Sequence, residues 1–246
     1  MTDNRFFIFA AIALLSLPAC GIKYKYEYSS VPNQDAFRYQ LYDLYEDENG
    51  EKGIVVYREI DEDNKEGAIF VLSLDETNAS WGPTDKAIFP NANESLVWWP
   101  TYAYDVNRAV YTLGADDYPA FKWCLAKNHN GEVYMGSWIL PGINEWLLMI
   151  NHSVDVTLLN EALVAHGGTR LAEKENYYWT ATEDNPAVTL ANDTEANWGF
   201  DARGRAVITD SELRVKTDKV YWSKSIIYRV RAIKYIYYYY KTEQEE

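Results

Sequence analysis

Positive charge is scarce in this chain of 246 residues, and the usual signatures of catalysis are missing. Lys and Arg total 23 against 37 Asp and Glu, which gives a formal net charge of −14. Because the phosphate backbone dominates the affinity of most nucleic-acid binders, a chain this acidic is not expected to bind DNA or RNA. The sequence also contains no HExxH, GxSxG, Walker A or GxGxxG pattern. We therefore expect neither a nucleic-acid-binding protein nor an enzyme.

Histidine is rare as well, and its spacing does not suit a metal centre. The three histidines, His129, His152 and His166, lie 23 and 14 residues apart without ligand-like partners, so surface or helix-end positions are expected for them. The acidic turn DEDNKEG fails as an EF-hand because Lys65 occupies a ligand position and Glu66 stands where glycine is required. The sequence predicts no bound metal and no cofactor.

The apolar run at the N-terminus is too short to span a bilayer. Phe6 to Ala19 would form a helix of roughly 21 Å, against about 30 Å of hydrocarbon, and such a run before small residues is typical of a secretory signal peptide. Its end, Leu17-Pro18-Ala19-Cys20, resembles the lipobox of bacterial lipoproteins. The resemblance implies a signal peptide over 1–19, a lipid anchor on Cys20 and a position at the bacterial outer membrane, periplasmic or surface-exposed. An ordinary secretory signal with a chance cysteine is the alternative.

Disulfide staples are excluded if Cys20 carries lipid, because Cys124 is the only other cysteine. The mature chain must then bury a real core, which 48% apolar residues, nine Trp and 21 Tyr can supply. No internal repeat or linker divides the chain after its first part. We expect a lipid-anchored tether with an edge strand over 20–50 and one domain over 51–246.

A β-hairpin is predicted near the start of this domain. The stretches KGIVVYREI (52–60) and AIFVLSLDE (68–76) are strand-like and flank a polar turn. Later strand-like stretches are YYWTATE, NWGFD, RAVIT and IIYRVRAIKYI. In the last of these, Arg229 and Arg231 alternate with apolar positions, which predicts a wet face that carries both arginines.

The last strand is expected to pair with the strand around Gly53–Ile60, which would bring the two ends of the domain together. The terminal YIYYYYK would then run beyond this partner, and we predict that it forms an added strand pair with Tyr24–Tyr28 of the tether; an exposed edge is the alternative.

Two helices are expected in the middle of the chain. One lies between Tyr102 and Leu113, and the other starts at Asp117 with Pro119 in its first turn, where proline is tolerated. On the second helix, apolar side chains share one face with Cys124, which predicts that this cysteine is a core residue.

Two further helices follow the segment SWILPGINEW. Apolar residues at i, i+3, i+4 and i+7 from Ile143 predict a short amphipathic helix. Asp155 can cap another helix that buries Val156, Leu159 and Leu163. Gly167-Gly168 is expected to end that helix with a left-handed residue.

Five short motifs in the same order resemble a known family. The chain is similar to the C-terminal domain of bacterial collagen-like adhesins, which also recurs in surface lipoproteins of gut anaerobes, over about Lys52 to Ile236. The family's opening is matched by the hairpin GIVVYREI…GAIFVLSLDE with Ser80-Trp81-Gly82. The other matching positions are Trp138, Leu140, Pro141, Asn144 and Glu145; Leu159, Asn160, Ala162, Leu163, Gly167 and Gly168; Tyr178, Trp179, Thr182 and Glu183; and Val230, Arg231 and Ala232.

This resemblance implies an α+β, C-type-lectin-like fold with about four short helices and with paired N- and C-terminal strands. It places Glu145 where a strand hands over to a helix. There a carboxylate accepts backbone N–H bonds and is stabilised by the helix dipole, so we interpret Glu145 as structural. The segment LPxxxEW also resembles formylglycine-generating enzymes, but their reaction needs a pair of cysteines that this chain lacks.

The implied function is that of an extracellular binding or adhesion module with a glycan or a surface protein as ligand. The alternative is a structural or assembly subunit of a surface complex, such as a fimbria-associated protein. Candidate ligand-binding residues are Trp98 and Trp99, which could stack on a sugar or pack in the core. Asp184 and Asn185 are further candidates because Glu183-Asp184-Asn185-Pro186 superficially resembles the sugar-binding loop of calcium-dependent lectins. Its displaced proline argues against a calcium site.

Overall fold

The structure is a computed structural model, and it describes most of the chain between Tyr39 and Tyr239. The described residues are 39–61, 66–83, 88, 102–129, 133, 136–142, 145–146, 148–149, 154–171, 177–182, 205–209, 212–216 and 224–239. Cys20 and Tyr24–Tyr28, and with them the predicted lipid anchor and tether strand, lie outside these residues.

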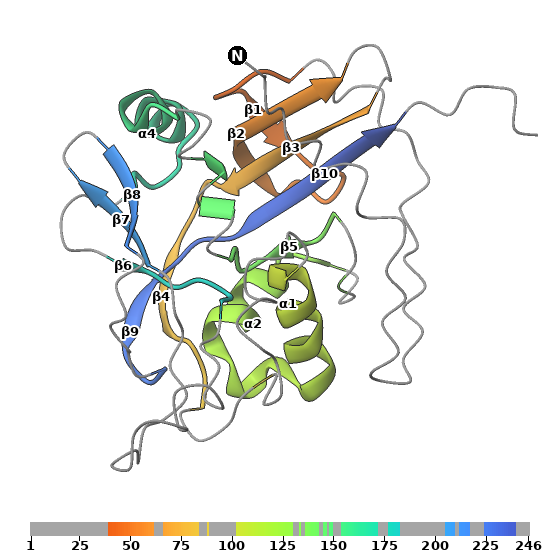
Figure 1. The fold of residues 1–246 in the computed structure, drawn as a ribbon, viewed down its shortest axis with the longest axis vertical. Helices are drawn as coiled ribbons and strands as arrows, with labels where there is room; N and C mark the ends of the chain where they lie inside the picture. Colours follow the sequence, from red (N-terminus) through yellow and green to blue (C-terminus); the bar gives the residue numbers. More distant parts are fainter. Residues whose placement is uncertain are drawn as a thin grey trace, which may run out of the picture.

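The described part is a mixed α/β arrangement of two five-stranded sheets and three α-helices. The first sheet has the order β1-β2-β3-β10-β5, and the second has the order β4-β9-β6-β7-β8. Figure 1 shows the first sheet above α1 and α2, with the second sheet to one side. The elements are β1 (Leu44–Glu46), β2 (Lys52–Asp61), β3 (Glu66–Ser73), β4 (Thr77–Ser80), α1 (Tyr102–Leu113), the 3₁₀ turn η4 (Ala115–Asp117), α2 (Pro119–Leu125), β5 (Trp138–Ile139), α4 (Val156–Ala165), β6 (Tyr177–Tyr178), β7 (Arg205–Thr209), β8 (Glu212–Lys216), β9 (Ile227–Val230) and β10 (Ile233–Tyr239).

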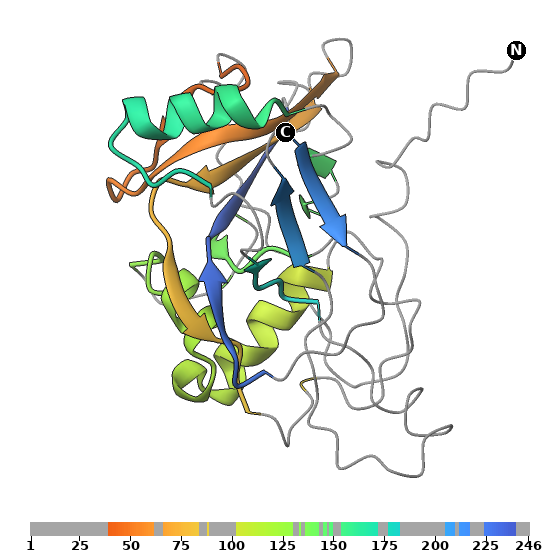
Figure 2. The same cartoon turned by 90° about the vertical axis from the view of Figure 1, so that its left-hand side faces the viewer.

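The predicted hairpin is confirmed, and it forms the centre of the first sheet. Strands β2 and β3 pair antiparallel, with a register shift between Val55 and Tyr57. Val71 and Leu72, consecutive residues of the regular strand β3, are both fully buried although they point to opposite faces, so the sheet is covered on both sides. Figure 2 shows α4 lying along one of these faces, beside β2.

The last strand does not pair with Gly53–Ile60, so the prediction of that partner is wrong. β10 pairs antiparallel with β3, from Ile233 opposite Leu72 to Tyr239 opposite Glu66. The physical reason is that β1 occupies the outer edge of β2, which leaves the edge of β3 for the C-terminal strand. β3 accompanies the tyrosine run up to Tyr239, which is the last residue of that run that the structure describes.

The second sheet is built from short strands that come from distant parts of the sequence. β4 pairs antiparallel with β9, and β6 lies between β9 and β7. The predicted strand RAVIT is β7, and it pairs with β8. Strand conformation stops at Arg231 and Ala232, between β9 and β10, where the chain passes from the second sheet into the first.

The helices match their sequence signals closely. α1 has the predicted bounds, whereas α2 begins at Pro119 rather than Asp117 because η4 takes up the preceding residues. Cys124 is fully buried, as predicted, and burial raises the pKa of its thiol well above the usual value. The Asp155 side chain accepts hydrogen bonds from Thr157 N and Leu158 N. Gly167, with φ of 76°, provides the left-handed residue after α4.

The helix predicted after SWILP is described only in part. Glu145, Trp146, Leu148 and Met149 are helical, and Trp146 is fully buried as its apolar spacing predicts. Met149, which lies outside the predicted apolar face, is fully buried as well. Within the described ranges, no helix is both long and apolar enough to cross a bilayer.

Candidate functional site

Two asparagine side chains fix the segment that carries Trp138 and Leu140. One edge of β5 pairs with β10. On the other edge, the Asn128 amide accepts from Trp138 N at 2.7 Å and donates to Trp138 O at 2.8 Å. Asn107 of α1 makes the same two contacts with Leu140, both at 2.9 Å. The two amides thus replace a neighbouring strand, which satisfies buried backbone groups that would otherwise be costly.

The Trp138 ring joins β5 to the turn that precedes β2. Its Nε1 donates to Asp47 Oδ2 at 3.0 Å, and Lys234 Nζ donates to the same oxygen at 2.8 Å. Burial acts to raise the pKa of Asp47, but its hydrogen bonds and the charge of Lys234 outweigh burial and hold the pKa below its usual value. Asp47 is therefore a charged structural bridge between the turn, β5 and β10.

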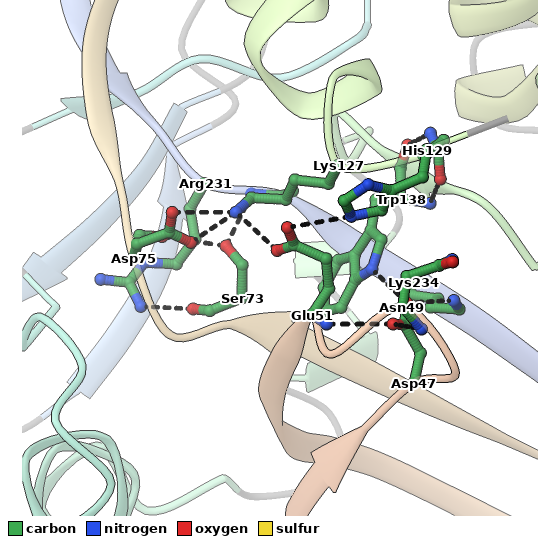
Figure 3. Close-up of polar contacts among 12 residues, drawn as sticks. Asp47, Asn49, Glu51, Ser73, Asp75, Lys127, His129, Trp138, Arg231 and Lys234 are labelled. Carbon is green, nitrogen blue, oxygen red and sulfur yellow. Dashed lines mark hydrogen bonds and ion pairs between the residues drawn. The ribbon is translucent and has the colours of Figure 1, made fainter. Parts of the chain in front are cut away.

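Lys127 forms a second bridge, between the end of α2 and the β2–β3 hairpin. Figure 3 shows its ammonium group between the carboxylates of Asp75 and Glu51, at 2.7 Å and 3.3 Å. The same ammonium lies 4.7 Å from the centre of the Trp123 ring, a cation–π distance. His129 lies beside this cluster, 3.7 Å from Glu51.

Arg231 is fully buried. The alternating pattern of the last strand predicted it on a solvent-exposed face, so that prediction is wrong. Its guanidinium donates to the carbonyl oxygens of Ser73, Leu74 and Thr169 and to Glu76 Oε2. The side chain is fully buried because these acceptors converge on it where the chain changes sheets. Arg231 thereby ties together β3, the chain before β4 and the segment after α4.

A separate group of contacts lies close to where residues 89–101, 183–204 and 217–223 join the described part of the chain. Trp81 Nε1 donates to Thr180 O at 2.8 Å, and Trp81 N donates to Lys224 O at 2.8 Å. The buried Lys224 ammonium lies 4.3 Å from the centre of the Trp81 ring. A Cβ added to Gly142 would stand 3.0 Å from Ala103 Cβ and 3.4 Å from Thr182 Oγ1. We call these residues the root cluster: Trp81, Ala103, Gly142, Thr180, Thr182 and Lys224.

The root cluster adjoins three stretches of the sequence, two of which contain candidate ligand-binding residues. Residues 89–101 end just before Ala103, residues 183–204 begin directly after Thr182, and residues 217–223 end at Lys224. Loops that a rigid scaffold positions carry a large share of binding sites in proteins. Trp81 is held in place by two rings that pack edge-on against it: Tyr118, the residue before α2, and Phe121 of α2.

Glu145 lies beside this cluster with an incompletely satisfied carboxylate. Its Oε1 accepts a hydrogen bond from the Tyr235 hydroxyl, whereas its buried Oε2 has no hydrogen-bond partner in the described part of the chain. Burial raises the pKa of Glu145, and Tyr235 and the backbone N–H groups of Glu145 and Gly142 offset only part of that effect. Oε2 would stand 2.7 Å from a Cβ on Gly142, so a larger residue there would force the Glu145 carboxylate to shift.

The described members of the predicted motif come together, and the others cannot be placed. Trp138, Leu140, Glu145 and Trp179 are all buried, and Pro141 O accepts from Ala181 N at 2.7 Å, which joins the two motifs. The remaining predicted residues lie outside the described residues: Cys20, Trp98, Trp99, Glu183, Asp184 and Asn185.

Sequence reasoning missed the polar residues that hold this region together. Asn107 has a usable signal, because it falls on the same helix face as Ala103 and Val110, at i, i+4 and i+7. Lys127 and Glu76 have no such signal, since their partners lie far away in the sequence. Among the described residues, no group of three or more His, Cys, Asp or Glu side chains is placed to hold a metal ion.

Comparisons of the chain with protein-family models, with curated proteins and with solved structures found no match.

Proposed function

We propose that the protein is a lipoprotein of the bacterial outer membrane whose mature domain is an extracellular binding or adhesion module. The lipobox ending in Cys20 supports the anchor, and the ordered motifs around Trp138 and Trp179 support a C-type-lectin-like fold. The ligand is a glycan or a surface protein, contacted by segments that the root cluster holds.

The observation that carries this proposal is the meeting of two segment ends at Gly142. Ala103 and Thr182 both lie next to Gly142, so residues 89–101 end close to where residues 183–204 begin. A trans chain advances at most about 3.6 Å per residue. Trp99 comes three residues before Tyr102 and Asn185 three residues after Thr182, so only a short stretch of chain joins each candidate residue to the described part of the protein.

This geometry supports a shared surface for the two sets of candidate residues. Tryptophan rings stack on the apolar faces of sugars, and carboxylate and amide groups accept and donate the hydrogen bonds that fix orientation. Trp98-Trp99 and Asp184-Asn185 supply these two chemistries from neighbouring points of one rigid scaffold.

A glycan array with the purified mature domain tests the proposal. We expect reproducible binding to one class of glycan that persists at physiological salt concentration. The outcome that contradicts glycan binding is an empty array together with stable co-purification of one envelope protein, which would favour a structural subunit of a surface complex.

A further inference from the structure

Glu145 occupies a place where its charge state would control how the root cluster is held. The carboxylate lies between the chain corner at Gly142 and strand β10, and 2% of the residue is exposed. Among the described side chains, its hydrogen-bond partner is the Tyr235 hydroxyl on β10, and Oε2 is directed towards Gly142. The neighbouring atoms at that corner belong to Ala103 and Thr182, the attachment points of residues 89–101 and 183–204.

The elements packed around Glu145 offer no cation to balance its charge. β10 presents Tyr235, whose own electrostatic neighbours are Glu145 and Tyr237. α1 presents the methyl group of Ala103, the segment after β6 presents the Thr182 hydroxyl, and the corner presents backbone N–H groups. Among these described elements, no charged side chain shifts the pKa of Glu145.

We propose that Glu145 is a proton-operated latch: the protonated carboxyl holds the Gly142 corner against β10, and loss of the proton loosens the corner and its contacts with Ala103 and Thr182. This regulatory role rests on the proposed function only because ligand binding is proposed there for the stretches of chain joined to Ala103 and Thr182. The latch itself is a property of the free protein, because an ionised carboxylate is costly in this buried position, and the Tyr235 hydroxyl and two backbone N–H groups offset only part of that cost.

The direction of the pH effect follows from linkage. Burial raises the pKa of Glu145 in the folded protein above its value in the open or unfolded chain. The stabilisation is therefore complete at acidic pH and is lost as pH rises through the interval between the two values. Over that interval the opening equilibrium increases by up to about ten-fold per pH unit.

Hydrogen exchange of the ligand-free domain tests the latch. Amides in 102–107, 138–142 and 178–182 are measured from pH 4.5 to 8 and corrected for the intrinsic pH dependence of exchange. Glu145→Gln keeps the shape and removes the charge, so we expect exchange at these amides to become independent of pH after correction. Glu59→Gln is the matched control, because Glu59 also accepts from a tyrosine, Tyr57, but is exposed.

A second variant covers the case in which Glu145→Gln disturbs folding. Tyr235→Phe removes a donor that lowers the pKa of Glu145 in the folded protein, so the pH-dependent rise in exchange should continue to higher pH than in the wild type. If wild type and both variants show the same corrected pH dependence, the latch does not exist. Since no ligand is used, that failure is distinguishable from an empty glycan array, which bears only on the proposed function.

Discussion

Replacing Arg231 by methionine keeps the length of the side chain and removes its charge and its hydrogen bonds. Four of the five N–H donors of the guanidinium are used, at distances from 2.7 to 3.3 Å, and the fifth, at Nε, has no partner among the described residues. The substitution would leave the carbonyl oxygens of Ser73, Leu74 and Thr169 with fewer donors. Glu76 would keep Arg229 and Tyr178 as partners.

The expected loss is large because the group is fully buried. Removing one partner of a buried, hydrogen-bonded ion pair costs about 3–5 kcal/mol, out of a total of about 5–15 kcal/mol for a typical domain. Arg229 is the matched control: it binds the same glutamate but keeps 31% of its side chain exposed. Arg229→Met should cost about 1 kcal/mol or less.

Urea-induced unfolding of the mature domain, followed by tryptophan fluorescence, measures both values. If the buried guanidinium of Arg231 joins these segments as described, Arg231→Met should lose clearly more free energy of unfolding than Arg229→Met. Equal losses, or a loss below about 1 kcal/mol for Arg231→Met, would show that the guanidinium does not hold the two sheets together.

Three further predictions concern the cap of α4, the Asp47 bridge and the anchor. Asp155→Ala removes the acceptor for Thr157 N and Leu158 N and should lower the free energy of unfolding by about 1 kcal/mol, whereas the exposed Asp116→Ala should change it little. Because the pKa of Asp47 is lowered, its contribution to stability is present above the ordinary aspartate pKa and should be lost as pH falls through about 4 and below; acid unfolding of Asp47→Asn should lack this component. Cys20→Ala should release the protein from membranes or leave the precursor uncleaved, and a mature protein that still fractionates with membranes would contradict the lipid anchor.

Local signals in the sequence were sufficient for the elements but not for their partners. The alternation in 52–60 and 68–76 predicted the hairpin, and Pro119, Asp155 and Gly167 marked helix ends correctly to within two residues. Such signals act within a few residues, so they predict type and bounds. The order of strands depends on which edges remain open after the hairpin forms, and β1 decides this by covering β2.

The surroundings of the candidate site were harder to predict for the same reason. Arg231 looked like a wet position in an alternating strand, yet its acceptors come from Ser73, Leu74, Glu76 and Thr169, more than 60 residues away in the chain. The structural role of Glu145 at the corner was predicted from the motif. Its unsatisfied oxygen follows from Gly142, Ala103 and Tyr235 converging on it, which no local pattern indicates.

The dissociation constant of the strongest glycan on the array tests the central claim most directly when it is measured for paired variants. Trp98→Ala/Trp99→Ala and Asp184→Ala/Asn185→Ala each remove one of the two chemistries, and Tyr111→Ala removes an exposed aromatic ring on α1 away from the root cluster. We expect both double variants to weaken binding by at least about ten-fold, the equivalent of about 1.4 kcal/mol, and Tyr111→Ala to bind like the wild type. If both double variants bind with unchanged affinity, the ligand does not contact the segments that the root cluster holds.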